Sequence, residues 1–169
     1  MKSSNYKPKR TWGAYYHNEL YHSNAYQTLT LNARNLLHCL MCEVDIRKVK
    51  VGKRKDQYTY PNNGEVSVTE RQFTSYFRRS KQTYTNARNL LIEVGCIRMT
   101  YKGGFGPGDY TKYKVLTLSH LPLNQQRWRK YPEHSWEKDI PKSRASLVGS
   151  KTRFKKGTSG RKPKTTLTP

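Results

Sequence analysis

Apolar residues are scarce in this sequence. They make up 34% of its 169 residues, against ~45–50% in an average globular domain. The length is enough for one domain with tails, and the low apolar content predicts that part of the chain lies outside any core. No apolar run approaches the ~18 residues of a membrane-spanning helix, and no charged segment leads into an apolar one as in a secretory signal. We therefore expect no membrane partner.

Acidic side chains are also few: 11 stand against 33 Lys and Arg, which gives a net charge of +22. Residues 11–118 carry 16 basic and eight acidic side chains, a net +8, whereas the shorter stretch 119–169 carries 13 and three, a net +10. The first ten residues add +4. Such an excess attracts phosphate and predicts a polyanionic partner. Nucleic acid is favoured over a membrane surface, because no amphipathic helix sets Trp or Phe opposite Lys.

Cysteine is limited to Cys39, Cys42 and Cys96. An odd number without a secretory signal indicates reduced thiols inside a cell. The stretch "CLMC" has the spacing of a metal-binding pair, with His38 beside it. No second Cys or His pair follows at zinc-finger spacing, however, and the first lies within an apolar segment. We expect thiols buried in a core, with neither a metal nor a cofactor.

Catalytic constellations are lacking as well. The carboxylates are scattered, and the five His residues form neither a His-x-His pair nor the His-Glu-x-x-His pattern of zinc hydrolases. The glycine-rich stretch "GGFGPG" lacks the Gly-Lys-Ser/Thr of a P-loop. The sequence therefore predicts a protein that is not an enzyme.

The hexapeptide "NARNLL" occurs twice, at residues 32–37 and 86–91. Repeat architectures need about three or more units, so two copies indicate two helices of one domain. Thr30 is the predicted N-cap of the first helix, which should run to about Ile46. Its apolar stripe is Ala33, Leu36, Leu37, Leu40, Met41 and Val44. Ser80 should cap the second helix, which runs to Val94 and ends at Gly95, with Tyr84, Ala87, Leu91 and Val94 inward.

Other elements follow from local patterns. One or two short helices are expected in 14–29, a solvated loop in 48–64, and a short strand at Val66 and Val68. Thr69 should cap a helix whose inward residues are Phe73, Tyr76 and Phe77. "CIRMTY" and "YKVLTL" have the period of paired strands. Beyond Leu121 the chain is polar and basic, typical of an extended tail. We thus divide it into a basic arm (1–11), a domain (12–121) and a tail (122–169).

The expected elements follow one another as helix, strand, short helix, three-residue turn, helix and hairpin. This order resembles that of the winged helix-turn-helix proteins encoded by bacterial viruses and of replication-initiator N-terminal domains. The matching motif positions are Ser80, Thr83, Leu91, Gly95 and Ile97, and the resemblance covers about Asn24 to Leu118. It implies an α+β winged helix-turn-helix fold. This fold has a three-helix core and a wing of two to three strands, here followed by a basic, mostly extended tail.

Candidate DNA contacts lie on the outward face of the second "NARNLL" helix. Gln and Asn can pair with adenine, and Arg or Lys with guanine or phosphate. On the first "NARNLL" helix, Asn32, Arg34 and Asn35 are expected only as scaffold. The full set of candidates is Lys81, Gln82, Thr85, Asn86, Arg88 and Asn89 on the helix, Arg78 and Arg79 in the turn, Lys102, Phe105 and Lys112 in the wing, and Arg153, Lys155, Lys156, Arg161 and Lys162 in the tail.

Two functions remain open at this point. The first is sequence-specific binding of double-stranded DNA by a virus- or mobile-element-encoded regulator or replication-origin binder. It would act in the host cytoplasm with the nucleoid, as a homodimer or with another protein partner. The alternative is an RNA-binding or nucleoprotein-assembly protein dominated by its basic tail, in which Trp128, Tyr131, Trp136 and Phe154 are interleaved with cations.

Overall fold

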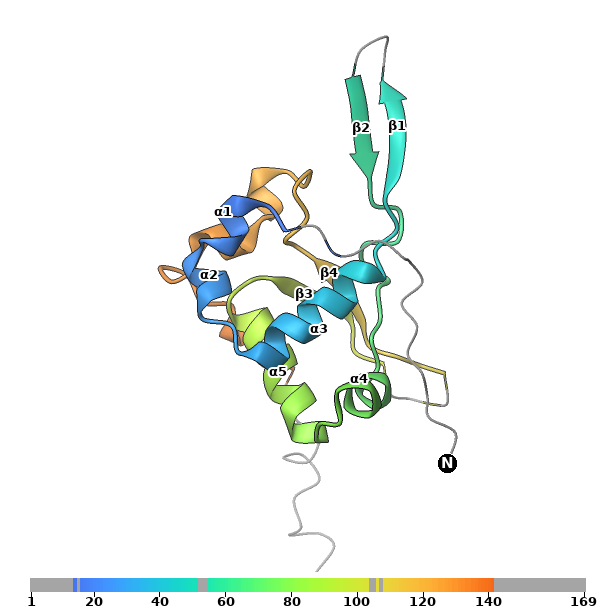
Figure 1. Cartoon of the computed structure of the whole chain (residues 1–169), viewed down its shortest axis with the longest axis vertical. Helices are drawn as coiled ribbons and strands as arrows, with labels where there is room; N and C mark the ends of the chain where they lie inside the picture. The colour runs from blue at the N-terminus through green and yellow to red at the C-terminus, as the bar shows by residue number, and fades with distance from the viewer. Residues whose placement is uncertain (1–13, 15, 52–54, 104–105, 107, 142–169) are drawn as a thin grey trace, which may run out of the picture.

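The computed structural model describes residue 14 and residues 16–51, 55–103, 106 and 108–141 (Figure 1). Within them the protein is a small α+β structure with two antiparallel two-stranded sheets. The helices are α1 (Asn18–Tyr21), α2 (Asn24–Gln27), α3 (Leu31–Cys42), α4 (Glu70–Phe77) and α5 (Lys81–Glu93). The strands are β1 (Arg47–Val51), β2 (Lys55–Thr59), β3 (Ile97–Tyr101) and β4 (Lys112–Val115). Three short 3-10 helices follow: η1 (Leu123–Gln125), η2 (Arg127–Lys130) and η3 (Glu137–Asp139).

The helix starts are set by side-chain caps. The Thr30 hydroxyl accepts a hydrogen bond from the Ala33 amide, and the Ser80 hydroxyl accepts one from the Thr83 amide. Thr69 and Gln72 form a reciprocal capping box at the start of α4. The three predicted caps are confirmed. They could be predicted because each depends on residues only three positions apart.

Helix α3 ends at Cys42, short of the predicted Ile46. The side chain of Asn62 is the cause. Its Nδ2 donates to the Glu43 carbonyl at 2.8 Å, and its Oδ1 accepts from the Asp45 amide at 2.6 Å. These bonds satisfy backbone groups that a longer helix would have used, and they turn the chain into β1.

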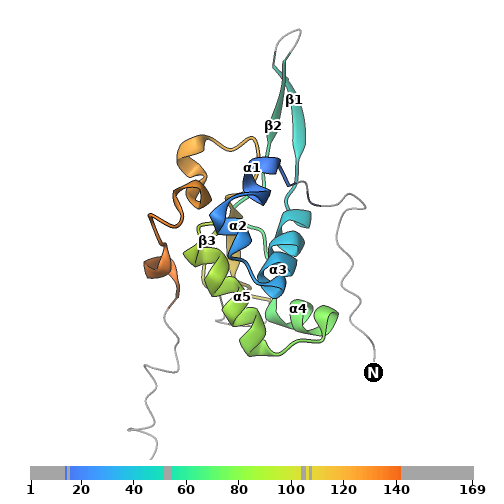
Figure 2. The ribbon, with the colours of Figure 1, turned by 60° about the vertical axis from the view of Figure 1, so that its left-hand side comes forward.

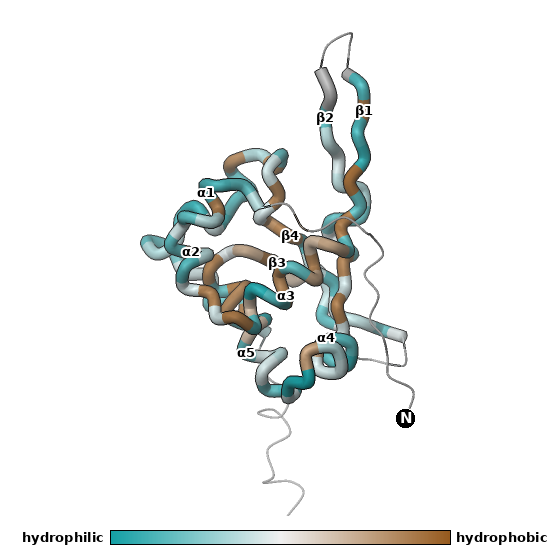
Figure 3. Tube along the Cα trace, in the orientation of Figure 1, coloured by the Kyte–Doolittle hydropathy of each residue, from teal (hydrophilic) through white to brown (hydrophobic). Residues whose placement is uncertain are grey.

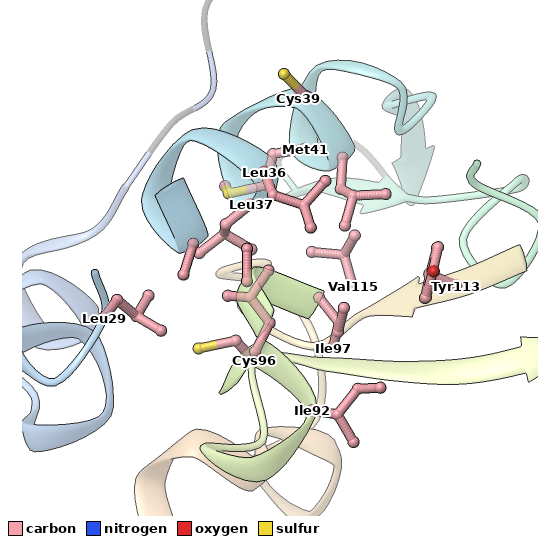
Figure 4. Packing of buried hydrophobic residues seen from close by; sticks show 14 of the residues in the cluster. Leu29, Leu36, Leu37, Cys39, Met41, Ile92, Cys96, Ile97, Tyr113 and Val115 are labelled. Atoms are coloured by element: carbon pink, nitrogen blue, oxygen red, sulfur yellow. The ribbon is translucent and has the colours of Figure 1, made fainter. Parts of the chain in front are cut away.

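The core lies where α3 packs on α5 and against the β3–β4 sheet (Figures 1 and 4). Figure 4 shows Leu36 and Leu37 of α3 in one cluster with Ile97 and Val115. Both predicted apolar stripes are buried: Ala33, Leu36, Leu37, Leu40, Met41 and Val44 from the first helix, and Tyr84, Ala87, Leu91 and Val94 from the second. The two "NARNLL" copies are therefore the facing helices of one core.

Tyr76 does not point inward as predicted. Its side chain is 54% exposed, whereas Phe73 is buried and Phe77 is partly buried against the core. Phe73 and Phe77 are four positions apart and form the inward row of this short helix. Tyr76 lies at the edge, with its ring 4.8 Å from that of Phe77 in an edge-to-face arrangement.

The segment 48–64 is not a solvated loop throughout, because it contains the β1–β2 hairpin. Arg47 pairs with Thr59 and Lys50 with Asp56. The hairpin projects from the body of the molecule in two views (Figures 1 and 2). The alternation of basic residues with Val49 and Val51 is the strand signal, which the high charge of the segment obscured.

The predicted pairing of "CIRMTY" with "YKVLTL" is confirmed as the β3–β4 hairpin, in which Ile97 pairs with Val115. The predicted short strand at Val66 and Val68 is wrong: both side chains are buried, but Val66 makes only an isolated bridge to Tyr113. Gly95 closes α5 with φ +77°, the left-handed conformation that glycine adopts without strain.

The predicted extended tail is wrong over residues 122–141, which fold back on the domain. Trp128 is 2% exposed and belongs to the core. The Trp136 amide donates to the Glu93 carbonyl at 2.9 Å, and the Arg127 guanidinium lies 4.0 Å from the centre of the Trp136 ring. A single Trp buries a large apolar area, which the polar average of this segment concealed. Residues 142–169 lie outside the described residues.

Candidate nucleic-acid interface

The candidate interface is built on a tight connection between α4 and α5. Residues 78–80 form the connection, as the sequence predicted, with both Arg side chains exposed. Arg78 adopts the left-handed conformation, with φ 52° and ψ 50°, and the amides of Arg78 and Arg79 bond to the Thr74 carbonyl. This αL residue reverses the chain, so that Ser80 can cap α5 at once.

Helix α5 is fixed against β4 by two buried phenols. The Tyr84 hydroxyl donates to the Val68 carbonyl at 2.8 Å and lies 3.2 Å from the Tyr113 hydroxyl. Burial raises the pKa of both phenols, so both stay protonated at neutral pH. The inward face of α5 is thereby locked, and its opposite face is turned to solvent.

The outward face begins with an amide pair. Gln82 and Asn86 are exposed, one helical turn apart, and the Gln82 Nε2 donates to the Asn86 Oδ1 at 2.7 Å. That bond uses one hydrogen of Gln82 and one oxygen of Asn86. The Gln82 carbonyl oxygen and the Asn86 amide nitrogen keep their hydrogen-bonding capacity, an acceptor beside a donor. Thr85 lies half-exposed between them in sequence.

Arg88 and Asn89 are arranged differently. The Arg88 Nε and Nη2 donate to the Asn89 Oδ1 at 3.2 and 2.9 Å, and both residues are half-buried. Arg88 also acts on Tyr113, whose pKa it lowers against the larger rise caused by burial. Arg88 therefore lies beside β4. Its contacts with Asn89 and Tyr113 give it a structural role that the sequence did not indicate.

Lys81 stands at the start of α5. Its Nζ lies 3.3 Å from a Glu70 carboxylate oxygen, and the Lys81 side chain is 85% exposed. An exposed pair of this kind contributes little stability, since water and salt screen it. The ammonium can therefore leave Glu70 for a stronger anion such as a phosphate.

The β3–β4 hairpin lies next in the chain. Lys102 is exposed, and Lys112 is half-buried with its Nζ 3.9 Å from a Glu65 oxygen. Gly103 has φ +61°, and a Cβ there would lie 2.6 Å from the Tyr110 carbonyl carbon. Only glycine fits where the chain leaving β3 comes this close to the chain entering β4. Phe105 lies outside the described residues, as do the tail candidates Arg153, Lys155, Lys156, Arg161 and Lys162.

The three thiols sit in the core. Cys39, Cys42 and Cys96 are buried and form no disulfide. Burial raises the pKa of Cys39 to about 12 and also raises that of Cys96, so neither thiol ionises at neutral pH. Within the described ranges, no three His, Cys, Asp or Glu side chains gather as metal ligands would. Nor is any helix in those ranges both long and apolar enough to traverse a bilayer.

The structure thus brings Arg78, Arg79, Lys81, Gln82 and Asn86 together around the start of α5. Sequence reasoning overlooked the β1–β2 hairpin, which projects from a different part of the molecule than α4 and the start of α5 (Figure 1). Comparisons of this chain with protein-family models, with curated proteins and with solved structures find no match.

Proposed function

We propose that this protein binds double-stranded DNA sequence-specifically, with α4, the 78–80 turn and α5 as a helix-turn-helix and the β3–β4 hairpin as its wing. The observation that carries the proposal is the exposed Gln82–Asn86 pair. It lies on the first turns of a helix whose other face is locked in the core, directly after a turn with two exposed Arg side chains.

The proposed contacts follow from groove chemistry. A helix fits the major groove, where adenine presents an acceptor and a donor side by side, and Asn or Gln can satisfy both. The Gln82–Asn86 pair offers the complementary donor and acceptor. Arg78, Arg79 and Lys81 are placed for phosphates beside the groove, as in other helix-turn-helix proteins. Lys102 and Lys112 of the wing would meet the adjacent backbone.

A binder of this kind acts at an operator or a replication origin. The resemblance to winged-helix proteins of bacterial viruses and to initiator domains supports either role, inside a host cell. The positive charge adds salt-dependent affinity for any DNA, which brings the protein to its site by diffusion along the duplex.

Selection from a randomised duplex pool tests the proposal. The full chain should enrich one sequence, and Gln82→Ala with Asn86→Ala should lose preference for it. Each substitution should cost about 1–3 kcal/mol on the selected site and little on random duplex. Thr28→Ala, at the exposed residue that follows α2, serves as the control. Failure to enrich any sequence would overturn sequence-specific binding.

The second candidate is RNA binding or nucleoprotein assembly. Residues 142–169 favour it, because they carry nine Lys and Arg and no acidic residue. Such a segment follows a phosphate backbone without reading bases. Equal affinity for unrelated DNA and RNA, with no enriched site, would favour this candidate over the first.

A further inference from the structure

The β1–β2 hairpin is a basic projection that the proposed function leaves unused. It stands at the end of the long axis opposite to α4 and the start of α5, in both Figures 1 and 2. Ile46, Val49 and Tyr58 at its base and on its strands are 46%, 44% and 37% exposed, so the core does not cover it. Figure 3 shows β1 as largely hydrophilic, with apolar interruptions.

The base of this hairpin is held in place. Asn62 bridges the chain that leads into β1, through Glu43 and Asp45, to the chain that leaves β2. The ring of Tyr58 stacks on that of His120, with centroids 4.6 Å apart. An isolated two-stranded hairpin is marginally stable in water. These contacts therefore present the hairpin in a defined direction.

The charge of the hairpin is arranged on both of its faces. Strand β1 carries three cations, Arg47, Lys48 and Lys50. Arg47 and Lys50 are both exposed on β1. They are three positions apart, and successive side chains of a strand alternate between faces. One cation therefore lies on each face of the two-stranded ribbon.

We propose that the β1–β2 hairpin is a second DNA-binding arm, which enters the major groove of a B-form duplex and binds phosphates without reading sequence. That groove is about 12 Å wide and admits a two-stranded β-ribbon. Phosphates line both of its walls, which matches cations on both faces of the ribbon. The major groove of duplex RNA is deep and narrow, so it does not admit the arm. The inference shares with the proposed function only the nature of the partner, duplex DNA.

The test compares charge variants of the full chain on random-sequence duplex DNA across a range of salt concentrations. Arg47→Gln with Lys50→Gln should lower the slope of log K against log salt by about 0.9 for each phosphate that is no longer neutralised, so by up to about 1.8. Arg47→Lys with Lys50→Arg keeps both charges and should restore the slope. Lys130→Gln with Lys138→Gln removes two exposed charges elsewhere and should leave the slope unchanged. The two single Gln variants should each give about half the effect.

Several outcomes would overturn the inference. An unchanged slope in the hairpin variant shows that the arm does not touch DNA, and an equal drop in the Lys130/Lys138 variant shows a general charge effect. An equal drop on an RNA duplex excludes the major groove. Loss of binding to vesicles containing phosphatidylserine, with DNA binding intact, assigns the arm to a membrane surface. Failure to enrich a site in the selection experiment overturns the proposed function and leaves the slope measurement unaffected.

Discussion

Tyr84 and Tyr113 place their phenol oxygens 3.2 Å apart in the core, where α5 meets β4. The Tyr84 hydroxyl donates its proton to the Val68 carbonyl. A phenol has one proton to give, so Tyr113 is the donor to Tyr84. The orientation of α5, and with it the direction of Gln82 and Asn86, depends on this short chain of buried hydrogen bonds.

Tyr84→Phe should lower the free energy of unfolding by about 1–3 kcal/mol, because it removes the donor to the buried Val68 carbonyl and one of the hydrogen-bond partners of the Tyr113 hydroxyl. Chemical denaturation measures the loss. Tyr110→Phe, at a side chain that is 54% exposed, is the control and should change little. Equal effects of the two substitutions would show that the buried phenols do not hold α5.

Gly95→Ala should detach the segment 127–141 from the end of α5. A Cβ at Gly95 would lie 2.8 Å from the Arg127 Cβ and from the Trp136 Nε1, and the φ of +77° adds strain for any side chain. The left-handed conformation alone costs about 1–2 kcal/mol. We expect a larger total loss in denaturation, together with a red shift of tryptophan fluorescence.

Gly106→Ala provides the matched control, since a Cβ there meets nothing within 4 Å. It should stay within about 0.5 kcal/mol of the parent protein. A Gly95→Ala variant with parental stability and fluorescence would contradict the packing of Trp136 on this glycine.

Arg78→Gly should separate stability from binding. Glycine relieves the left-handed strain at this position and should raise the free energy of unfolding by up to about 1 kcal/mol. The same change removes a cation proposed to bind phosphate, which should lower the salt slope of DNA binding by about 0.9. Arg78→Ala removes the cation without relieving the strain, and it should bind like the Gly variant while being less stable.

The stability of the protein should fall in alkaline solution, in part through Cys39. Burial raises the pKa of this thiol from 9.0 to about 12. Above pH 9 the unfolded chain releases the thiol proton and the folded chain retains it. The unfolded state then binds fewer protons, so the free energy of unfolding decreases as pH rises. Cys39 contributes at most about 1.4 kcal/mol per pH unit between pH 9 and 12.

The measurement is the free energy of unfolding at pH 8, 9, 10 and 11, for the parent protein and for Cys39→Ala. The difference in slope between the two isolates Cys39 from the other buried thiols and phenols. Parallel slopes would mean that the thiol is accessible in the folded state.

Two truncations distinguish the folded segment from the rest of the C-terminal sequence. A chain ending after Leu121 lacks Trp128 and should lose about 3–5 kcal/mol of stability, as Trp→Ala changes in cores do. A chain ending after Pro141 keeps Trp128 and Trp136 and should unfold near the parental midpoint, while its DNA affinity depends less on salt. Equal stability of both truncated chains would place Trp128 outside the core.

The features that could be predicted from the sequence are local. The caps Thr30, Thr69 and Ser80, the closing Gly95 and the two apolar stripes each depend on residues a few positions apart. The features that were missed depend on distant partners. Trp136 reaches the end of α5 across more than forty residues, and nothing near Asn62 in the sequence indicates that it ends α3.

The candidate site divides in the same way. The outward positions of Gln82 and Asn86 follow from helical periodicity, and they are exposed. The half-buried position of Arg88 beside Tyr113 depends on how α5 is rotated against β4, which periodicity alone does not fix. The β1–β2 hairpin was not predicted because its strands are rich in Lys and Arg, which are depleted in strands that pack on a core. This two-stranded sheet does not cover a core, so its strands tolerate these residues.

Asn63 links two parts of the chain through a side chain that can change chemically with time. Its Nδ2 donates to the Val115 carbonyl at 3.0 Å, and its Oδ1 accepts from the Val115 amide at 2.7 Å, so one amide side chain joins the chain after β2 to strand β4. The next residue is Gly64, and an Asn-Gly pair is prone to deamidation: the Gly64 amide nitrogen attacks the Asn63 side-chain carbonyl, ammonia leaves, and water opens the resulting ring to a carboxylate. The Asn63 Nδ2, which now donates to the Val115 carbonyl, would be replaced by a carboxylate oxygen. Two acceptor oxygens would then face each other. Deamidation of Asn63 during storage should therefore weaken the link between the chain after β2 and strand β4. It would be detected as one added negative charge on an intact chain.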